Sequence, residues 1–113
     1  MPYKNIFNYV FVNAQSMASS FESDVIDLSN VQGFSVQADY TGSPVGTLKL
    51  MVSDNGSKFY DYPNSSVSIP TTDGGQLYIV SQVHFDKVKL VYTASSGSGN
   101  LTAQINAKGD DDA

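Results

Sequence analysis

Residues 45–62 read V-G-T-L-K-L-M-V-S-D-N-G-S-K-F-Y-D-Y, and this stretch decides the fold class. Leu48, Leu50 and Val52 occupy every second position, which is the period of a strand with one buried face. The Asp-Asn-Gly at 54–56 follows at once, and Asn-Gly favours a tight type I′ turn with positive φ. Residues 58–62 then return with aromatic side chains. The stretch therefore predicts a β-hairpin.

The rest of the chain reads in the same way. Residues 34–40 alternate most cleanly between apolar and polar side chains. The denser apolar runs at 6–15 and 77–80 predict strands that are covered on both faces, the first of them partly by a neighbouring subunit. Further strands are predicted at 22–28, 67–69, 85–93 and 101–107.

About eight strands at roughly ten-residue spacing, separated by Gly, Pro and Asn turns, predict an all-β, single-domain antiparallel sandwich. A strand number near eight favours a jelly roll over an immunoglobulin-like arrangement. We expect an N-terminal arm at 1–5, the sandwich at 6–108, and an acidic disordered tail at 109–113.

Composition excludes several function classes. The chain has 113 residues, no Cys and a net charge of −5. Without Cys it has no disulfide framework, thiol nucleophile or Cys-based zinc site. It has no Arg and only six Lys, so we expect no sequence-independent binding to nucleic acid, which requires a basic surface. No run of eighteen apolar residues occurs, and the N-terminus lacks a signal-peptide pattern, so we expect synthesis in the cytoplasm and no membrane partner.

Candidate catalytic and metal-binding residues are few. His84 is the single histidine, and no G-x-S-x-G nucleophile elbow accompanies it, so a surface or structural role is favoured. Asp54 and Asn55 could open a calcium loop, but the further oxygen ligands and the distal Glu are absent, and a turn explains them. We predict no catalytic, cofactor-binding or metal-binding residue, and no enzymatic activity.

A first group of candidate interface residues crowds the N-terminus. Such a concentration of aromatic side chains either forms an exposed patch that marks association or is buried within the domain, and both alternatives stay open. In the first case, an N-terminal arm would dock on a neighbouring subunit. The group comprises Tyr3, Phe7, Tyr9 and Phe11.

A second group, the aromatic cluster Phe59, Tyr60 and Tyr62, surrounds Asp61. A sugar-binding platform has this composition, because aromatic faces stack on pyranose rings. The favoured interpretation is that Phe59 packs inward while the two tyrosines cover an edge or contact a neighbouring subunit.

Three segments resemble one family. Residues 46–60, G-T-L-K-L-M-V-S-D-N-G-S-K-F-Y, are similar to the pattern G-x-L-x-V-x-x-S-x-D-G-x-x-W of discoidin-like, galactose-binding-like domains and small bacteriophage virion proteins. Residues 85–92, F-D-K-V-K-L-V-Y, resemble the strand Y-V-R-L-x-Y. Residues 95–108, S-S-G-S-G-N-L-T-A-Q-I-N-A-K, resemble the closing arm G-x-G-x-L-x-V-x-I-x-A-K of phage structural proteins.

The resemblance implies a structural protein of the virion, either a head decoration or capsid-associated protein or a tail module. It implies a homo-oligomer that contacts itself and the major capsid or tail proteins, with no cofactor. The alternative is a carbohydrate-binding module of a phage tail or adhesin that recognises host surface glycans. The missing Trp and Arg depart from the pattern and weaken the carry-over of a sugar site.

Overall fold

The computed structural model describes residues 3–110, and the side chains of residues 6–109. Within this part the chain forms ten strands, and no helix is long and apolar enough to cross a membrane. The strands are β1 (Tyr3–Ser16), β2 (Phe21–Glu22), β3 (Ile26–Asp27), β4 (Gly33–Gly42), β5 (Val45–Ser53), β6 (Tyr60–Asp61), β7 (Val67–Ile69), β8 (Gly75–Val80), β9 (Lys87–Ser96) and β10 (Gly99–Asp110).

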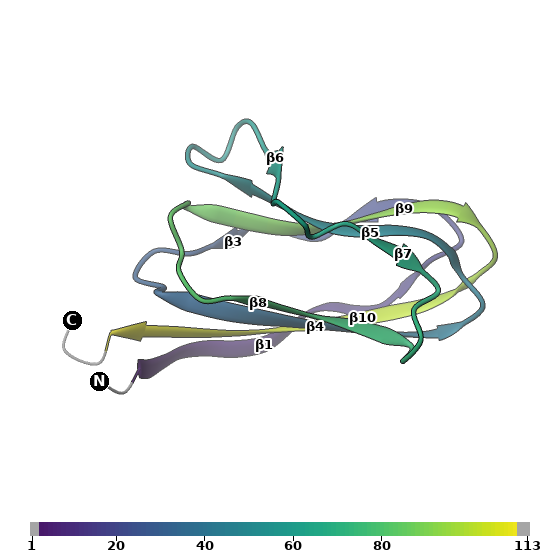
Figure 1. Cartoon of the computed structure of the whole chain (residues 1–113), viewed down its shortest axis with the longest axis horizontal. Helices are drawn as coiled ribbons and strands as arrows, with labels where there is room; N and C mark the ends of the chain where they lie inside the picture. The colour runs from purple at the N-terminus through teal and green to yellow at the C-terminus, as the bar shows by residue number, and fades with distance from the viewer. Residues whose placement is uncertain (1–2, 111–113) are drawn as a thin grey trace.

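Two antiparallel sheets face each other (Figure 1). The first sheet has the order β1-β10-β4-β8, and the second has the order β2-β9-β5-β6. In the second sheet β3 also pairs with β9, and β7 also pairs with β5. The short strands β2 and β3 therefore occupy one strand position beside β9, and β6 and β7 occupy one strand position beside β5. The predicted all-β antiparallel sandwich is confirmed. With each shared position counted once, the strand orders become 1-8-3-6 and 2-7-4-5, the order of a jelly roll.

Alternation along the strands fills the space between the sheets with apolar side chains. On β10, Leu101, Ala103 and Ile105 are all 0% exposed, and on β5, Leu48 and Leu50 are each 1% exposed. Burial of each large aliphatic side chain contributes roughly 1.5–3 kcal/mol. One continuous apolar layer therefore holds the two sheets together.

The first and last strands pair over almost their whole length (Figure 1). Tyr3 pairs with Asp110, and Asn5 pairs with Lys108. The predicted arm at 1–5 is therefore corrected at residues 3–5, which begin β1. The predicted tail at 109–113 is corrected at Gly109 and Asp110, which end β10, because the register of the closing strand continues through them. The remaining residues of both segments lie outside the described part.

The hairpin at 45–62 is wider than predicted. β5 ends at Ser53 and β6 is short, so residues 54–59 form a loop between them. A type I′ turn needs positive φ at both central residues, and in this loop only Gly56 has it, at 76°. The prediction of a tight Asn-Gly turn is therefore wrong.

The strands predicted to be covered on both faces are instead half-exposed. On β8, Tyr78 and Val80 are 7% and 2% exposed, but Leu77 and Ile79 are 53% and 71% exposed. On β1, Val10 is 47% exposed. Both strands belong to the first sheet, which packs one face on the second sheet and turns the other face outward, so only alternate side chains are buried. Burial on both faces is wrong for β8, and cover of β1 by a neighbouring subunit stays a prediction.

Candidate interaction surfaces

The aromatic residues predicted near the N-terminus divide between core and surface. Phe7 and Phe11 are half-buried and pack against the core. Tyr9 is 46% exposed, and its ring centre lies 5.5 Å from that of Phe7. Tyr3 lies on β1, outside the described side chains. Among the described members, Tyr9 is the one that a partner can readily reach.

The second aromatic cluster divides in the same way. Tyr62 is half-buried and meets Phe85 edge-on, with ring centres 5.7 Å apart. Phe59 is half-buried, and the Lys89 ammonium lies 4.4 Å from its ring centre. Tyr60 is 60% exposed. Tyr60 is therefore the member with a ring open to solvent.

The two aromatic groups lie at opposite edges of the sandwich. Phe11 on β1 and Phe21 on β2 line one cavity of about 160 Å³ at the β1 end of the first sheet. Tyr62 instead lines a cavity of about 260 Å³ together with β8, at the other end of that sheet. The predicted interface residues therefore do not form one continuous surface, and their role as an interface stays a prediction.

The outward face of the second sheet carries paired charges. The Lys49 ammonium lies 2.9 Å from the Asp61 carboxylate, and the Lys89 ammonium lies 2.8 Å from the Glu22 carboxylate. The Lys89 side chain is only 15% exposed because it also lies over Phe59. The charges on this face are thus largely satisfied within the chain.

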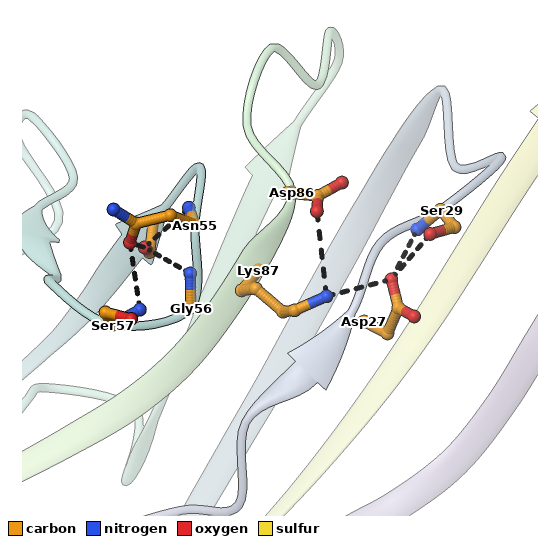
Figure 2. A network of polar contacts seen from close by, with 8 residues as sticks. Asp27, Ser29, Asn55, Gly56, Ser57, Asp86 and Lys87 are labelled. Atoms are coloured by element: carbon orange, nitrogen blue, oxygen red, sulfur yellow. Dashed lines mark hydrogen bonds and ion pairs between the residues drawn. The ribbon is translucent and has the colours of Figure 1, made fainter.

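A third charged group lies at the start of β9, where Lys87 is 3.5 Å from Asp27 and 3.6 Å from Asp86 (Figure 2). The Ser29 hydroxyl and backbone N–H both donate to Asp27 Oδ1, at 2.7 and 2.9 Å. These hydrogen bonds, with a smaller contribution from Lys87, lower the pKa of Asp27 from its ordinary value. The pairs are exposed to water, so each stabilises the fold only slightly.

Two short side chains hold the 54–59 loop (Figure 2). Ser53 Oγ accepts hydrogen bonds from the backbone N–H of Asn55 and Gly56, at 3.2 and 2.9 Å, and donates to Asn55 Oδ1 at 3.1 Å. Asn55 Oδ1 also accepts from the backbone N–H of Ser57 and Lys58, at 2.9 and 3.1 Å. The Asn55 oxygen is engaged within the loop, which favours a structural role over a calcium ligand.

A cavity of about 310 Å³ opens beside this loop. Asp54, Lys58, Tyr60 and His84 are among its lining residues. His84 is exposed, which agrees with the surface position expected from the sequence. Nowhere among the described residues do three or more His, Asp or Glu side chains gather as a metal site.

The outward face of the first sheet is nearly uncharged. Among the described side chains, its charged residues are Asp39 and Lys108. Gln104 Nε2 donates to Asn8 Oδ1 at 2.6 Å across β10 and β1, and Gln37 Nε2 donates to Asp39 Oδ2 at 2.9 Å along β4. The strand register sets two central rows across the sheet, Asn8–Asn106–Ser35–Ile79 and Val10–Gln104–Gln37–Leu77.

Aliphatic side chains lie at the ends of these rows. Val10 ends one row on β1, and Leu77 and Ile79 end both rows on β8. Leu77 and Ile79 line a hollow of about 390 Å³ together with Asn106 and Lys108. The Asn106 Oδ1 atom is buried there with no hydrogen-bond partner. Sequence reasoning missed this surface, although residues 75–82 carry no charge.

Comparison with known proteins finds similarity in structure. No family model and no curated sequence matches the chain. The SPBc2 prophage-derived protein YomS matches with a TM-score of 0.69 at 12% identity, over 95% of this chain and 96% of YomS. A protein of Bacillus endospore appendages, described as disulfide-linked pili, matches with a TM-score of 0.53 at 14% identity, over 97% of this chain and 93% of that one. At these identities the likeness shows a shared fold.

Proposed function

We propose that this chain is a structural protein of a bacteriophage particle, a capsid-associated or decoration protein without enzymatic activity. It acts by binding copies of itself and proteins of the capsid or tail, and its location is the virion. The sandwich shared with a prophage-derived protein and with a spore-appendage protein supports this proposal by analogy of fold.

The observation that carries the proposal is the contrast between the two outward faces. The second sheet pairs its charges within the chain, as in Lys89 with Glu22. The first sheet instead presents amides and exposed aliphatic side chains, Ile79 the most exposed of them at 71%. Charged residues are depleted at the centres of protein interfaces, whereas neutral polar and apolar groups are accepted there. The first sheet therefore presents the better docking face.

A non-enzymatic role also fits the residues around the single histidine. Ser53, Asp54 and His84 line one cavity, which is the composition of a catalytic triad. The Ser53 side chain is only 3% exposed, and its hydroxyl donates to Asn55 and accepts from two backbone amides. A nucleophile needs that hydroxyl directed at a base, so Ser53 serves the loop instead.

The proposal is tested on particles of the phage or prophage that encodes the chain. Particles are banded on a density gradient, and the chain is quantified by mass spectrometry in each fraction. We expect it to band with the capsid proteins at a fixed ratio to the major capsid protein. A chain that stays at the top of the gradient while intact particles band below would refute the assignment.

Glycan recognition is the second candidate, and the exposed Tyr60 favours it. Its ring lies 5.4 Å from the Lys58 ammonium and borders the 310 Å³ cavity with Asp54 and His84. An aromatic face beside polar groups is suited to one sugar ring. Screening by glycan array, followed by titration of any hit against a Tyr60→Ala variant, tests this function. Binding that Tyr60→Ala abolishes would support it, and an empty array would count against it.

A further inference from the structure

The two edges of the first sheet are built differently. β1 pairs with β10 through three shifts of register, and bulges of this kind disrupt an edge and make it harder to extend. β8 pairs with β4 without a shift, from Phe34 with Val80 to Asp39 with Gly75. It contains no Pro and no charged residue. The β8 strand therefore lacks the bulges, prolines and charges that commonly prevent a sheet from gaining a strand.

The hydrogen bonds show which backbone groups of β8 face outward. Tyr40 N–H donates to the Gly74 carbonyl, and Thr71 Oγ1 accepts from Gly75 N–H and donates to the Gly75 carbonyl. Gly74 therefore bonds toward β4, whereas Gly75 points away from it. In an antiparallel ladder this direction alternates from residue to residue. Leu77 and Ile79 consequently point their N–H and C=O groups to the outer edge, where the Leu77 carbonyl accepts a hydrogen bond from the exposed Gln76 side-chain amide at 3.3 Å.

The same two residues carry the exposed apolar side chains. Leu77 and Ile79 project onto the outward face, at 53% and 71% exposed. The edge is flanked by the 390 Å³ hollow on that face and, beside Tyr62, by the 260 Å³ cavity. Backbone donors, backbone acceptors and apolar surface are thus presented together, which is the combination that strand addition uses.

We propose that the β8 edge pairs antiparallel with β8 of a second copy of this chain, around a twofold axis at Tyr78. Leu77 then lies opposite Ile79 of the second copy, and Ile79 lies opposite its Leu77. Two four-stranded first sheets become one eight-stranded sheet. This inference deepens the proposed self-association by naming its contact, and it rests on that part of the proposed function.

Symmetry and charge favour a second copy over another occupant. The twofold register uses the outward backbone groups of Leu77 and Ile79, and the Leu77 carbonyl exchanges its exposed Gln76 donor for the Ile79 N–H of the second copy. It leaves Gly75, which Thr71 already satisfies, outside the central bonds. Asp39 pairs with Gly75 at one end of β8, whereas Lys108 lines the hollow with Ser81 at the other end. Antiparallel pairing places the acidic end of each copy against the basic end of the other, and parallel pairing would place like charges together.

The contact is small, with two aliphatic side chains from each copy, so we expect a weak and concentration-dependent dimer. Sedimentation equilibrium over a wide concentration range tests it on the full chain. Ile79→Lys places a charge in the contact and should weaken dimerisation by tenfold or more. Val10→Lys, on the opposite edge, is the matched control and should dimerise like the wild type. Circular dichroism checks that both variants are folded.

Cysteine crosslinking tests the register, because the chain has no native Cys. In the proposed register, the double variant Leu77→Cys/Ile79→Cys brings two pairs of thiols within disulfide range across the axis. It should form covalent dimers under mild oxidation, well ahead of Leu77→Cys or Ile79→Cys alone. A single variant that crosslinks as well as the double variant would overturn this register.

The remaining outcomes separate this inference from the proposed function. A wild-type chain that stays monomeric at every concentration, or an Ile79→Lys variant that still dimerises, overturns the β8 contact. If Val10→Lys abolishes dimerisation instead, self-association survives and uses β1, so the β8 contact is wrong. If the chain bands with particles but never dimerises, and Ile79→Lys releases it from them, then β8 binds a particle protein and the second copy is ruled out.

Discussion

The two outward faces of this sandwich treat charge in opposite ways. On the second sheet, lysines and carboxylates are paired at contact distance, as Lys49 is with Asp61 at 2.9 Å. On the first sheet, the side-chain amides of Gln104 and Asn8 bond to each other. Aliphatic side chains such as Ile79 lie at the β8 end of the rows. The charged side chains of the second sheet thus have their partners within a single copy. The first sheet can gain contacts with another molecule without the dehydration of many charged groups.

The largest difference in the free energy of unfolding should lie between substitutions on the inward and the outward side of β8. Tyr78 is buried and its hydroxyl donates to the Leu48 carbonyl at 3.2 Å, which joins the sheets, and burial raises the pKa of this phenol. We expect Tyr78→Ala to lower the free energy of unfolding by about 3–5 kcal/mol. We expect Ile79→Ala, one residue further, to change it by less than about 0.5 kcal/mol.

Urea denaturation at neutral pH and low protein concentration measures both variants, because the proposed dimerisation would otherwise contribute to the wild-type value. Equal losses for the two variants would break the comparison, since the outward side of β8 would then belong to the core.

A smaller effect should come from the second sheet. Lys89 contacts both the Glu22 carboxylate and the Phe59 ring. We expect Lys89→Ala to lower the free energy of unfolding by about 1–2 kcal/mol, because it removes a shielded ion pair and a cation–π contact together. Lys58→Ala removes only an exposed cation–π contact with Tyr60 and should cost less than about 1 kcal/mol. Thermal unfolding measures the two variants side by side, and equal melting temperatures would contradict this ranking.

The smallest effect should be a pH dependence of the free energy of unfolding that arises from Asp27 on the second sheet. The folded pKa of Asp27 lies below its ordinary value, so its ionised form is favoured by folding. The stability that Asp27 contributes is present when the pH is above the pKa of this carboxyl in the unfolded chain. It is lost as the pH falls through the pKa of the folded protein. Asp27→Asn should therefore approach the wild type in stability below about pH 4. Urea midpoints across this range measure it, and a constant gap between the two proteins would contradict it.

Sequence alone predicts the sandwich well because period-2 alternation reports directly on which side of a strand is buried. Residues 34–40 alternate cleanly, and Phe34, Val36 and Ala38 are buried as that pattern requires. Turns were harder to predict. The Asn-Gly of the 54–59 loop favours a tight turn locally, yet Ser53 and Asn55 form five hydrogen bonds that stabilise a wider one.

The candidate surface could not be read from periodicity. A dense apolar run such as 77–80 looks the same when it is covered on both faces and when it lies at an open edge. Which of the two applies depends on the neighbouring strands. Among the described residues β4 is the single neighbour of β8, and this is set by the topology of the sheet. For the same reason, the aromatic residues near the N-terminus divided into the half-buried Phe7 and Phe11 and the exposed Tyr9 only once β1 was placed.

The pairing of β1 with β10 has a consequence for how the protein is made. Tyr3 pairs with Asp110, so the first sheet cannot close until residue 110 has left the ribosome. Contacts this distant along the chain slow folding, because the loop between them must be ordered first. During translation β1 therefore remains without its partner strand until β10 has been made. Until β10 has emerged, the unpaired backbone groups of β1 are therefore exposed to incorrect strand pairing.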